Sequence, residues 1–229
     1  MKKIEFLDLT ATGFDSPKPA LTLIPDWYKK QKSYSKFNGK NPPNGGDTVA
    51  TVKKCIPVFD VMTNGYIIST IMDIYVKEEN GEKVVQTAID PNYVGRHDIK
   101  QFEEYPTKDK ILLKINNYWG IKTPFGYSCL FIPPAHRENI INILPAIVDT
   151  DFYHAGVAFV FTFSDPNFVG YIPAGTPIAQ VIPFKREDWT SSFSYSQENI
   201  LIAKQQESRL RSFFYEGYKR LFWNKKTFK

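Results

Sequence analysis

The sequence predicts a mainly β fold with an extended N-terminal arm and a C-terminal α-helix. Short apolar segments rich in β-branched and aromatic residues recur through the middle of the chain, separated by Gly, Pro, Asn and Asp. Proline and glycine interrupt residues 1–48, where apolar residues do not recur at the spacing of a helix or a strand. Apolar residues at helical spacing appear near the end of the chain. We therefore expect an arm over residues 1–48, a β core domain over 49–189, and a helix with a basic tail over 190–229.

The composition is that of a folded globular protein. Of 229 residues, 42% are apolar, 15% aromatic and 23% charged, which excludes a wholly disordered chain. No apolar run approaches the roughly eighteen residues of a membrane span, and an acidic residue follows the first apolar ones too early for a signal peptide. The two cysteines and three histidines are scattered without metal-ligand spacing, so no metal site is predicted.

Charge is distributed unevenly along the chain. Residues 1–57 hold ten Lys/Arg and five Asp/Glu, residues 58–197 hold eleven and sixteen, and residues 198–229 hold eight and three, giving +5, −5 and +5. The basic ends either contact an acidic partner such as nucleic acid or dock onto the acidic middle of the same or a neighbouring subunit. Because the lysines are spread without a tight cluster, docking or plain solvation is the preferred interpretation and nucleic acid is disfavoured.

In the arm, Pro25 and the residues after it have the form of a short helical turn with proline at its first position. Trp27 and Tyr28, beside lysines, could stack on a base. The preferred interpretation is that they anchor the arm to the core by burying aromatic area.

Turn residues divide the middle of the chain. Apolar runs flank Asn64-Gly65, and residues 78–83 have the composition of a hairpin turn. Residues 111–115 predict a short strand, and residues 117–134 predict two strands around a turn at 124–126. Two further apolar segments, at 157–163 and 174–184, are joined by a loop and form the predicted centre of the β core.

The chain leaves this core through a serine-rich connector over residues 190–196. Ser194 and Gln197 have the form of a capping box. A single helix is predicted beyond them by an apolar stripe made of Leu210, Phe213, Phe214, Gly217, Leu221 and Phe222. We expect this stripe to pack on a core or on a neighbouring subunit rather than on a membrane surface.

Two stretches of the β core carry a family resemblance. Residues 147–152 read Ile-Val-Asp-Thr-Asp-Phe, and residues 175–182 read Gly-Thr-Pro-Ile-Ala-Gln-Val-Ile. They resemble two of the five signature motifs of the trimeric dUTPase and dCTP deaminase superfamily. The resemblance implies a dUTPase-like β-clip core, a homo-oligomer of the trimeric kind found in the superfamily, and a nucleoside-binding hairpin.

The same resemblance implies roles for individual residues. Asp149 takes the place that orients the attacking water, and Phe152 takes the place that stacks on the deoxyribose. Gln180 takes a mainly structural place. The candidate nucleotide-binding residues are thus Asp149, Asp151, Phe152 and Gln180, and Asp149 is the candidate catalytic residue. Asp149 and Asp151 as turn-capping residues are an equally supported interpretation.

Several parts of the superfamily's machinery have no counterpart here. Ile67 stands in the place of the acid associated with the metal-bound triphosphate, and residues 124–128 contain no arginine to hold phosphate. Residues 198–229 contain one glycine, Gly217, where dUTPases have a glycine-rich closing tail. Residues 157–163 lack the glutamate of a deaminase. We therefore expect neither catalysis nor a cofactor, with Mg²⁺ required only if the chain is a hydrolase.

A second resemblance concerns the source. Ile-Pro-Asp-Trp-Tyr-Lys at 24–29 and Ile-Pro-Phe-Lys-Arg-Glu-Asp-Trp at 182–189 resemble an uncharacterised family of tailed-phage proteins, which implies a location in the host cytoplasm or in the virion.

Three hypotheses for function remain. The preferred one is a non-catalytic, oligomeric structural or interaction module. The others are a protein that sequesters a nucleotide in the hairpin pocket around Asp149, and a divergent nucleoside triphosphate hydrolase.

Overall fold

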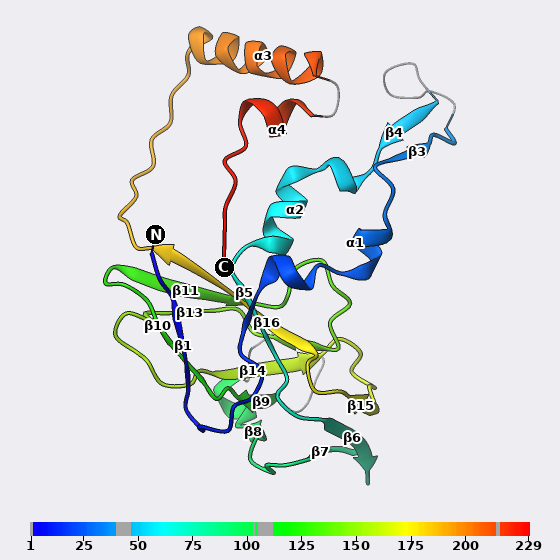
Figure 1. The fold of residues 1–229 in the computed structure, drawn as a ribbon, viewed down its shortest axis with the longest axis vertical. Helices are drawn as coiled ribbons and strands as arrows, with labels where there is room; N and C mark the ends of the chain where they lie inside the picture. Colours follow the sequence, from blue (N-terminus) through cyan, green and yellow to red (C-terminus); the bar gives the residue numbers. More distant parts are fainter. Residues whose placement is uncertain (1, 40–46, 103, 105–111, 214–215) are drawn as a thin grey trace. The chain divides into compact units, whose positions relative to one another are not determined.

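The computed structural model describes residues 2–39, 47–102, 104, 112–213 and 216–229 and divides the chain into two compact units (Figure 1). The β unit comprises Met1–Leu23 and Gly65–Arg186, and the helical unit comprises Ile24–Asn64 and Glu187–Lys229. Each unit is therefore built from two separate chain segments. This division differs from the predicted boundaries after residues 48 and 189. The predicted N-terminal arm is shared between both units, and its residues 40–46 lie outside the described part.

The largest sheet of the β unit has five antiparallel strands in the order β13-β11-β16-β5-β2; Figure 1 labels β13, β11, β16 and β5. Their bounds are β2 Lys18–Pro19, β5 Tyr66–Ser69, β11 Tyr127–Ile132, β13 Ala146–Val148 and β16 Pro177–Lys185. The central strand β16 pairs with β11 on one side and β5 on the other. Its residues Ile178, Ala179 and Val181 are buried, as expected for a strand covered by neighbours.

Three smaller sheets complete the β unit. A four-stranded sheet contains β8 Val94–His97, β9 Leu112–Asn116, β12 Ile141–Ile143 and β14 Ala158–Phe163. A three-stranded sheet contains β6 Ile74–Glu79, β7 Glu82–Thr87 and β15 Gly170–Ile172. A two-stranded sheet pairs β1 Glu5–Asp8 with β10 Trp119–Lys122. The predicted hairpin at 78–83 is confirmed, because Asn80 and Gly81 take positive φ values of 54° and 77° between β6 and β7.

One hydrophobic cluster joins these sheets. In β14 every second side chain is buried, namely Phe159, Phe161 and Phe163, and the Phe159 ring lies 5.6 Å from that of Phe131 in β11. Burying each such side chain stabilises a fold by about 1.5–3 kcal/mol. The predicted mainly β fold with a C-terminal helix is confirmed.

The Asn64-Gly65 turn separates elements of different kinds. The helix α2 Ile56–Thr63 precedes it and the strand β5 follows, so the structure places a helix in a stretch that the sequence assigned to the β core. Pro57 lies in the first turn of α2, where its missing N–H is not needed. Gly65 has φ +74°, and a Cβ there would lie 2.0 Å from the carbonyl oxygen of Val181. Only glycine fits this position.

Around α2, the helical unit contains short elements. These are α1 Asp26–Lys30, the paired strands β3 Tyr34–Lys36 and β4 Thr48–Ala50, and the 3-10 turn η3 Val52–Lys54. Tyr28 is buried, stacks on Phe59 with ring centres 6.1 Å apart, and accepts a 2.6 Å hydrogen bond at its carbonyl from Lys53 Nζ. Tyr28 therefore anchors α1, whereas Trp27 remains partly exposed.

The C-terminal segment forms two helices where one was predicted. The helix α3 spans Gln197–Ser212 and α4 spans Gly217–Leu221, so the prediction of a single helix through residue 222 is wrong. The predicted capping box is also shifted: the cap is Ser196, whose Oγ accepts from the N–H of Asn199, and not Ser194. No helix in the described part of the chain is long and apolar enough to cross a membrane.

Candidate functional site

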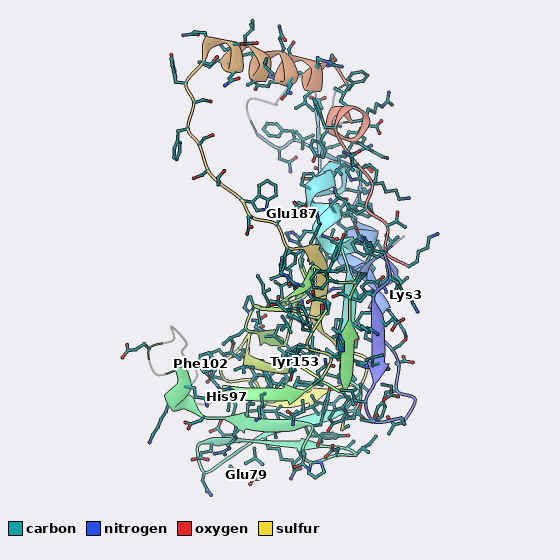
Figure 2. The ribbon with its side chains drawn as sticks, turned by 90° about the vertical axis from the view of Figure 1, so that its left-hand side faces the viewer. Lys3, Glu79, His97, Phe102, Tyr153 and Glu187 are labelled. Atoms are coloured by element: carbon teal, nitrogen blue, oxygen red, sulfur yellow. The ribbon has the colours of Figure 1, made fainter. Side chains whose placement is uncertain are left out.

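The candidate site is a tight turn over residues 149–153 that follows β13. The carbonyl oxygen of Asp149 accepts hydrogen bonds from the N–H groups of Phe152 at 3.0 Å and Tyr153 at 2.9 Å, which close the turn. Tyr153 marks its position in Figure 2. Antiparallel pairing sets Val148, the last residue of β13, opposite Cys129 of β11, and sets Tyr127, the first residue of β11, opposite Lys185, the last residue of β16. Three separate chain segments therefore meet at this turn.

A buried threonine pair holds the turn against the loop before β11. The hydroxyl oxygens of Thr150 and Thr123 lie 2.8 Å apart, and the N–H of Thr123 donates to the carbonyl of Thr150 at 3.2 Å. Thr150 Oγ1 also donates to the buried Cys129 Sγ at 3.3 Å. Because Thr150 is hydrogen-bonded to Thr123 and Cys129 inside the protein, the turn is held in place. The backbone positions of Asp149 and Asp151, on either side of Thr150, are therefore fixed.

Asp151 forms an ion pair with Arg186, the residue directly after β16, whose own side chain is 33% exposed. Arg186 donates from Nη1 to Asp151 Oδ1 at 2.8 Å and from Nη2 to Oδ2, and the backbone N–H of Gly126 donates to Oδ2 at 2.8 Å. The Asp151 side chain is 1% exposed. The hydrogen bonds from Arg186 lower the pKa of Asp151 to about 2, although burial acts in the opposite direction.

Asp149 is more exposed and joins the same network. Its Oδ1 accepts from Ser128 Oγ at 2.6 Å and from Arg186 Nη1 at 3.2 Å. Arg186 also donates to Ser128 Oγ at 2.9 Å and to the Tyr127 carbonyl at 3.2 Å. The two carboxylates therefore brace neighbouring segments of the sheet.

Two exposed aromatic rings border this network. Phe152 and Phe125 lie edge to face with ring centres 5.8 Å apart, and the guanidinium carbon of Arg186 lies 5.8 Å from the Phe152 ring centre. A planar ligand could stack here beside hydrogen-bonding groups. The structure thus brings together three of the four predicted nucleotide-binding residues: Asp149, Asp151 and Phe152.

The fourth predicted residue, Gln180, lies apart. In β16 it pairs opposite Ile132 of β11 and Ile67 of β5, its side chain has no exposed surface, and its Oε1 accepts from the N–H of Ala135 at 3.0 Å. Gln180 therefore holds the loop after β11, as its mainly structural place implies. Ile67 is equally buried in the sheet.

Sequence reasoning missed the two residues that complete the network, Arg186 and Ser128. Arg186 lies 35 residues from Asp151 in sequence, and no spacing motif connects them. The available signal was that Arg186 is a basic residue directly after the apolar run of β16. The strand beside β16 is β11, which also pairs with β13, the strand that leads into the acidic turn. Using that signal requires the register of β11 against β13 and β16.

The network does not fit a magnesium triphosphate. Arg186 contributes +1 while Asp149 and Asp151 contribute −1 each, so the formal charge of the three is −1, and further negative charge would be repelled. The arginine is already held by both carboxylates. Among the described residues, no group of three His, Cys, Asp or Glu side chains could hold a metal ion.

Comparison with known proteins gives similarity at the level of structure only. The sequence matches no family model and no curated protein. A mutant dUTPase from phage phi11 of S. aureus is similar in structure with 10% sequence identity and a TM-score of 0.35, over 85% of this chain and 97% of that one. A mutant dUTPase of Staphylococcus bacteriophage 80alpha is similar with 11% identity and a TM-score of 0.35, over 85% and 88%.

The descriptions of these two structures name phage dUTPases, the family that residues 147–152 and 175–182 resemble. A TM-score of 0.35 at 10% identity says nothing of activity, so function is argued below from the chain's own residues.

Proposed function

We propose that this chain is a non-catalytic, phage-encoded protein that self-associates and serves as an oligomeric structural or interaction module. The observation that carries the proposal is a stretch of exposed aromatic side chains after β16, in residues 187–196, here called the aromatic connector. In this stretch Trp189 is 86%, Phe193 100% and Tyr195 84% exposed. Figure 2 shows the connector leaving Glu187 as an extended segment that leads to α3.

The exposed apolar surface continues into α3. This helix has no buried residue, and Ile200, Leu201 and Ile202 in its first turns are all exposed. Single exposed apolar residues are common, but six exposed large apolar side chains within the fourteen residues 189–202 are typical of an interaction surface. Aromatic residues are also the side chains most enriched in protein interfaces. A partner that covers the connector and the start of α3 would remove this surface from water.

A second copy of the chain is the partner that the charges favour. Residues 198–229, which include α3, carry +5, whereas residues 58–197, which include most of the β unit and the connector itself, carry −5. Charges of opposite sign on two surfaces of the same chain attract when copies meet, and they steer encounter more than they add affinity.

The Asp149 network supports a non-catalytic role. A water-activating carboxylate has to accept a proton in the reaction, and one of the two oxygens of Asp149, Oδ1, is already held by Ser128 and Arg186. A phosphoryl-transfer site also needs positive charge to meet the phosphates, and the cation that the described residues bring to this network, Arg186, is paired with Asp151.

Sedimentation velocity across a range of protein concentrations tests the proposal. The wild-type chain is expected to form a defined oligomer, and the double variant Trp189→Ser/Phe193→Ser is expected to shift toward monomer at equal concentration. The matched control is Phe125→Ser, which removes an aromatic ring that is 82% exposed on the β unit. A monomeric wild-type chain, or equal oligomers in the double variant and wild type, would contradict the proposal.

A second candidate function is nucleotide binding at the Asp149 turn. It is favoured by the exposed Phe152 and Phe125 rings beside Arg186 and Asp149. Calorimetry against nucleoside mono-, di- and triphosphates, with and without Mg²⁺, separates the alternatives. Heat without turnover, lost in Phe152→Ala, would support a sequestering protein. Cleavage abolished by Asp149→Asn would support a hydrolase.

A further inference from the structure

The helical unit contains a basic groove that the site described above does not use. The groove has a volume of 610 Å³ and lies between α1, the loop after it, and the β3–β4 pair; its lining includes Trp27, Lys30, Lys32, Tyr34 and Lys36. Local hydrogen bonds shape it. Thr51 donates from Oγ1 to the carbonyl of Lys32 and from its N–H to the carbonyl of Ser33 at 3.0 Å, which fixes the loop between α1 and β3.

The lysines of the groove differ from their neighbours in having no close ion-pair partner among the described residues. Neighbouring lysines have partners within the helical unit: Lys29 pairs with Asp26 at 3.0 Å, and Lys54 pairs with Glu216 at 3.1 Å. By contrast, Lys30, Lys32 and Lys36 form no ion pair within the described part of the chain, and no acidic residue lines the groove. Three positive charges therefore face one concave surface, which favours an anionic ligand.

Two aromatic rings share the groove with these lysines. Trp27 is 41% and Tyr34 is 43% exposed. Each ring is supported by a protein contact: Trp27 meets the buried Tyr28 edge to face at 5.5 Å, and Lys54 Nζ lies 5.3 Å from the Tyr34 ring centre. Supported, half-exposed rings are suited to stacking on a planar group, because little of their freedom remains to be lost on binding.

We propose that this groove binds single-stranded nucleic acid. Positive charge that follows a phosphate backbone, combined with aromatic rings that stack on bases, is the combination by which proteins hold single strands. An acidic protein surface would use the lysines but leave both rings exposed. A duplex is disfavoured because its bases are stacked and α1, with five residues, is too short to read a major groove.

This inference revises an expectation from the sequence. In the sequence the basic residues of the N-terminal segment are spread without a tight cluster, which disfavours nucleic acid. The loop over residues 31–33 and the pairing of β3 with β4 bring Lys30, Lys32 and Lys36 to one surface. The alternation of side chains along a strand also places Tyr34 and Lys36 on the same face of β3.

Fluorescence anisotropy with a labelled oligothymidylate of about 16 nucleotides is the direct test. The full-length chain is expected to bind it, with log K falling against log salt concentration at a slope of about −2 for three phosphate contacts on a single strand. A duplex of equal length is expected to bind at least tenfold more weakly, since it offers no free base to Trp27 and Tyr34.

Matched variants locate the binding. The triple variant Lys30→Glu/Lys32→Glu/Lys36→Glu is expected to lose about a hundredfold in affinity, whereas Lys77→Glu/Lys100→Glu/Lys122→Glu, with the same change of charge on exposed residues of the β unit, is expected to lose much less. Trp27→Ala is expected to lose about tenfold and Trp27→Phe about twofold to threefold. Unchanged far-ultraviolet circular dichroism shows that each variant is folded.

Tryptophan fluorescence tests stacking on Trp27 directly, and it remains usable if Trp27→Ala disturbs α1. In a Trp189→Phe/Trp223→Phe background, the oligonucleotide is expected to quench the remaining exposed tryptophan, Trp27, while Trp119 is buried. Absence of binding by the wild-type chain would overturn the proposal. So would an equal loss in the two triple variants, equal affinity for duplex, or binding without quenching, which would indicate attraction of charge without a groove.

Discussion

At the scale of single residues, Asp151 has its carboxylate surrounded by donors from Arg186 and the Gly126 backbone, with 1% of the side chain exposed. Its pKa is about 2 in the folded chain, against an ordinary value of 3.8. A carboxyl whose pKa is lowered by folding stabilises the folded state above the unfolded pKa. That contribution is lost as pH falls through the folded pKa, because the unfolded state binds the proton first.

We therefore predict that part of the stability of this chain is lost between about pH 4 and pH 2 through Asp151. Chemical unfolding of wild type and Asp151→Asn at a series of pH values measures this. The free energy of unfolding of the wild type should exceed that of Asp151→Asn at neutral pH, and the difference should shrink on acidification. If the difference in free energy of unfolding between wild type and Asp151→Asn did not change with pH, the stabilisation would not depend on the negative charge of Asp151.

Two glycines with similar backbones provide a matched pair. Gly65 and Gly81 have φ +74° and +77°, but a Cβ at Gly65 would meet the Val181 carbonyl at 2.0 Å while one at Gly81 would meet nothing within 4 Å. We predict that Gly81→Ala costs about 1–2 kcal/mol from backbone strain. Gly65→Ala should cost about 3 kcal/mol or more because the clash adds to the strain. Urea unfolding measures both, and equal costs would contradict the close approach of Gly65 to β16.

At the scale of elements, α3 depends on its cap. The helix has no buried residue, so packing within the chain does little to hold it and local terms matter more. Ser196→Ala is predicted to destabilise α3 by about 1 kcal/mol, seen as faster amide hydrogen exchange in its first turns. Ser194→Ala is the control and should change exchange by only a few tenths of that free energy. A larger increase in exchange for Ser194→Ala than for Ser196→Ala would show that Ser194 caps the helix, as the sequence predicted.

At the scale of the whole molecule, the aromatic connector should report on assembly. Trp189, Phe193 and Tyr195 are cleavage sites for chymotrypsin in a segment without helix or strand. We predict rapid cleavage at low protein concentration and at least tenfold slower cleavage at concentrations where the oligomer forms, because a covering partner excludes the protease. Cleavage rates independent of concentration, measured by mass spectrometry, would place the connector outside any interface.

Removal of residues 198–229 is likewise expected to lower the mass of the assembly. This truncation also removes Trp223 and Glu216, which bind Asp60 and Lys54 within the helical unit. The connector variants are therefore the cleaner measurement, since they leave these contacts in place.

Much of the fold could be predicted because the signals are local. The alternation of buried phenylalanines in 158–163, the Asn80-Gly81 turn and the apolar run that becomes β16 depend on residues close in sequence. The helix at Ile56–Thr63 was not predicted, because an apolar run beside an Asn-Gly turn suits a strand equally well. The break between α3 and α4 was missed because the apolar stripe continues across it at helical spacing.

The sequence by itself determined the mainly β character of the chain, the acidic turn at 149–151 and the uneven charge, since these follow from local pattern and composition. Tertiary structure alone decided that Arg186 and Ser128 meet Asp149 and Asp151, and that Gln180 does not. It also decided that Lys30, Lys32 and Lys36 share a groove with two aromatic rings. The reason is physical: such neighbours are set by strand register and by the pairing of distant segments, and a shift of one residue would turn each side chain to the opposite face.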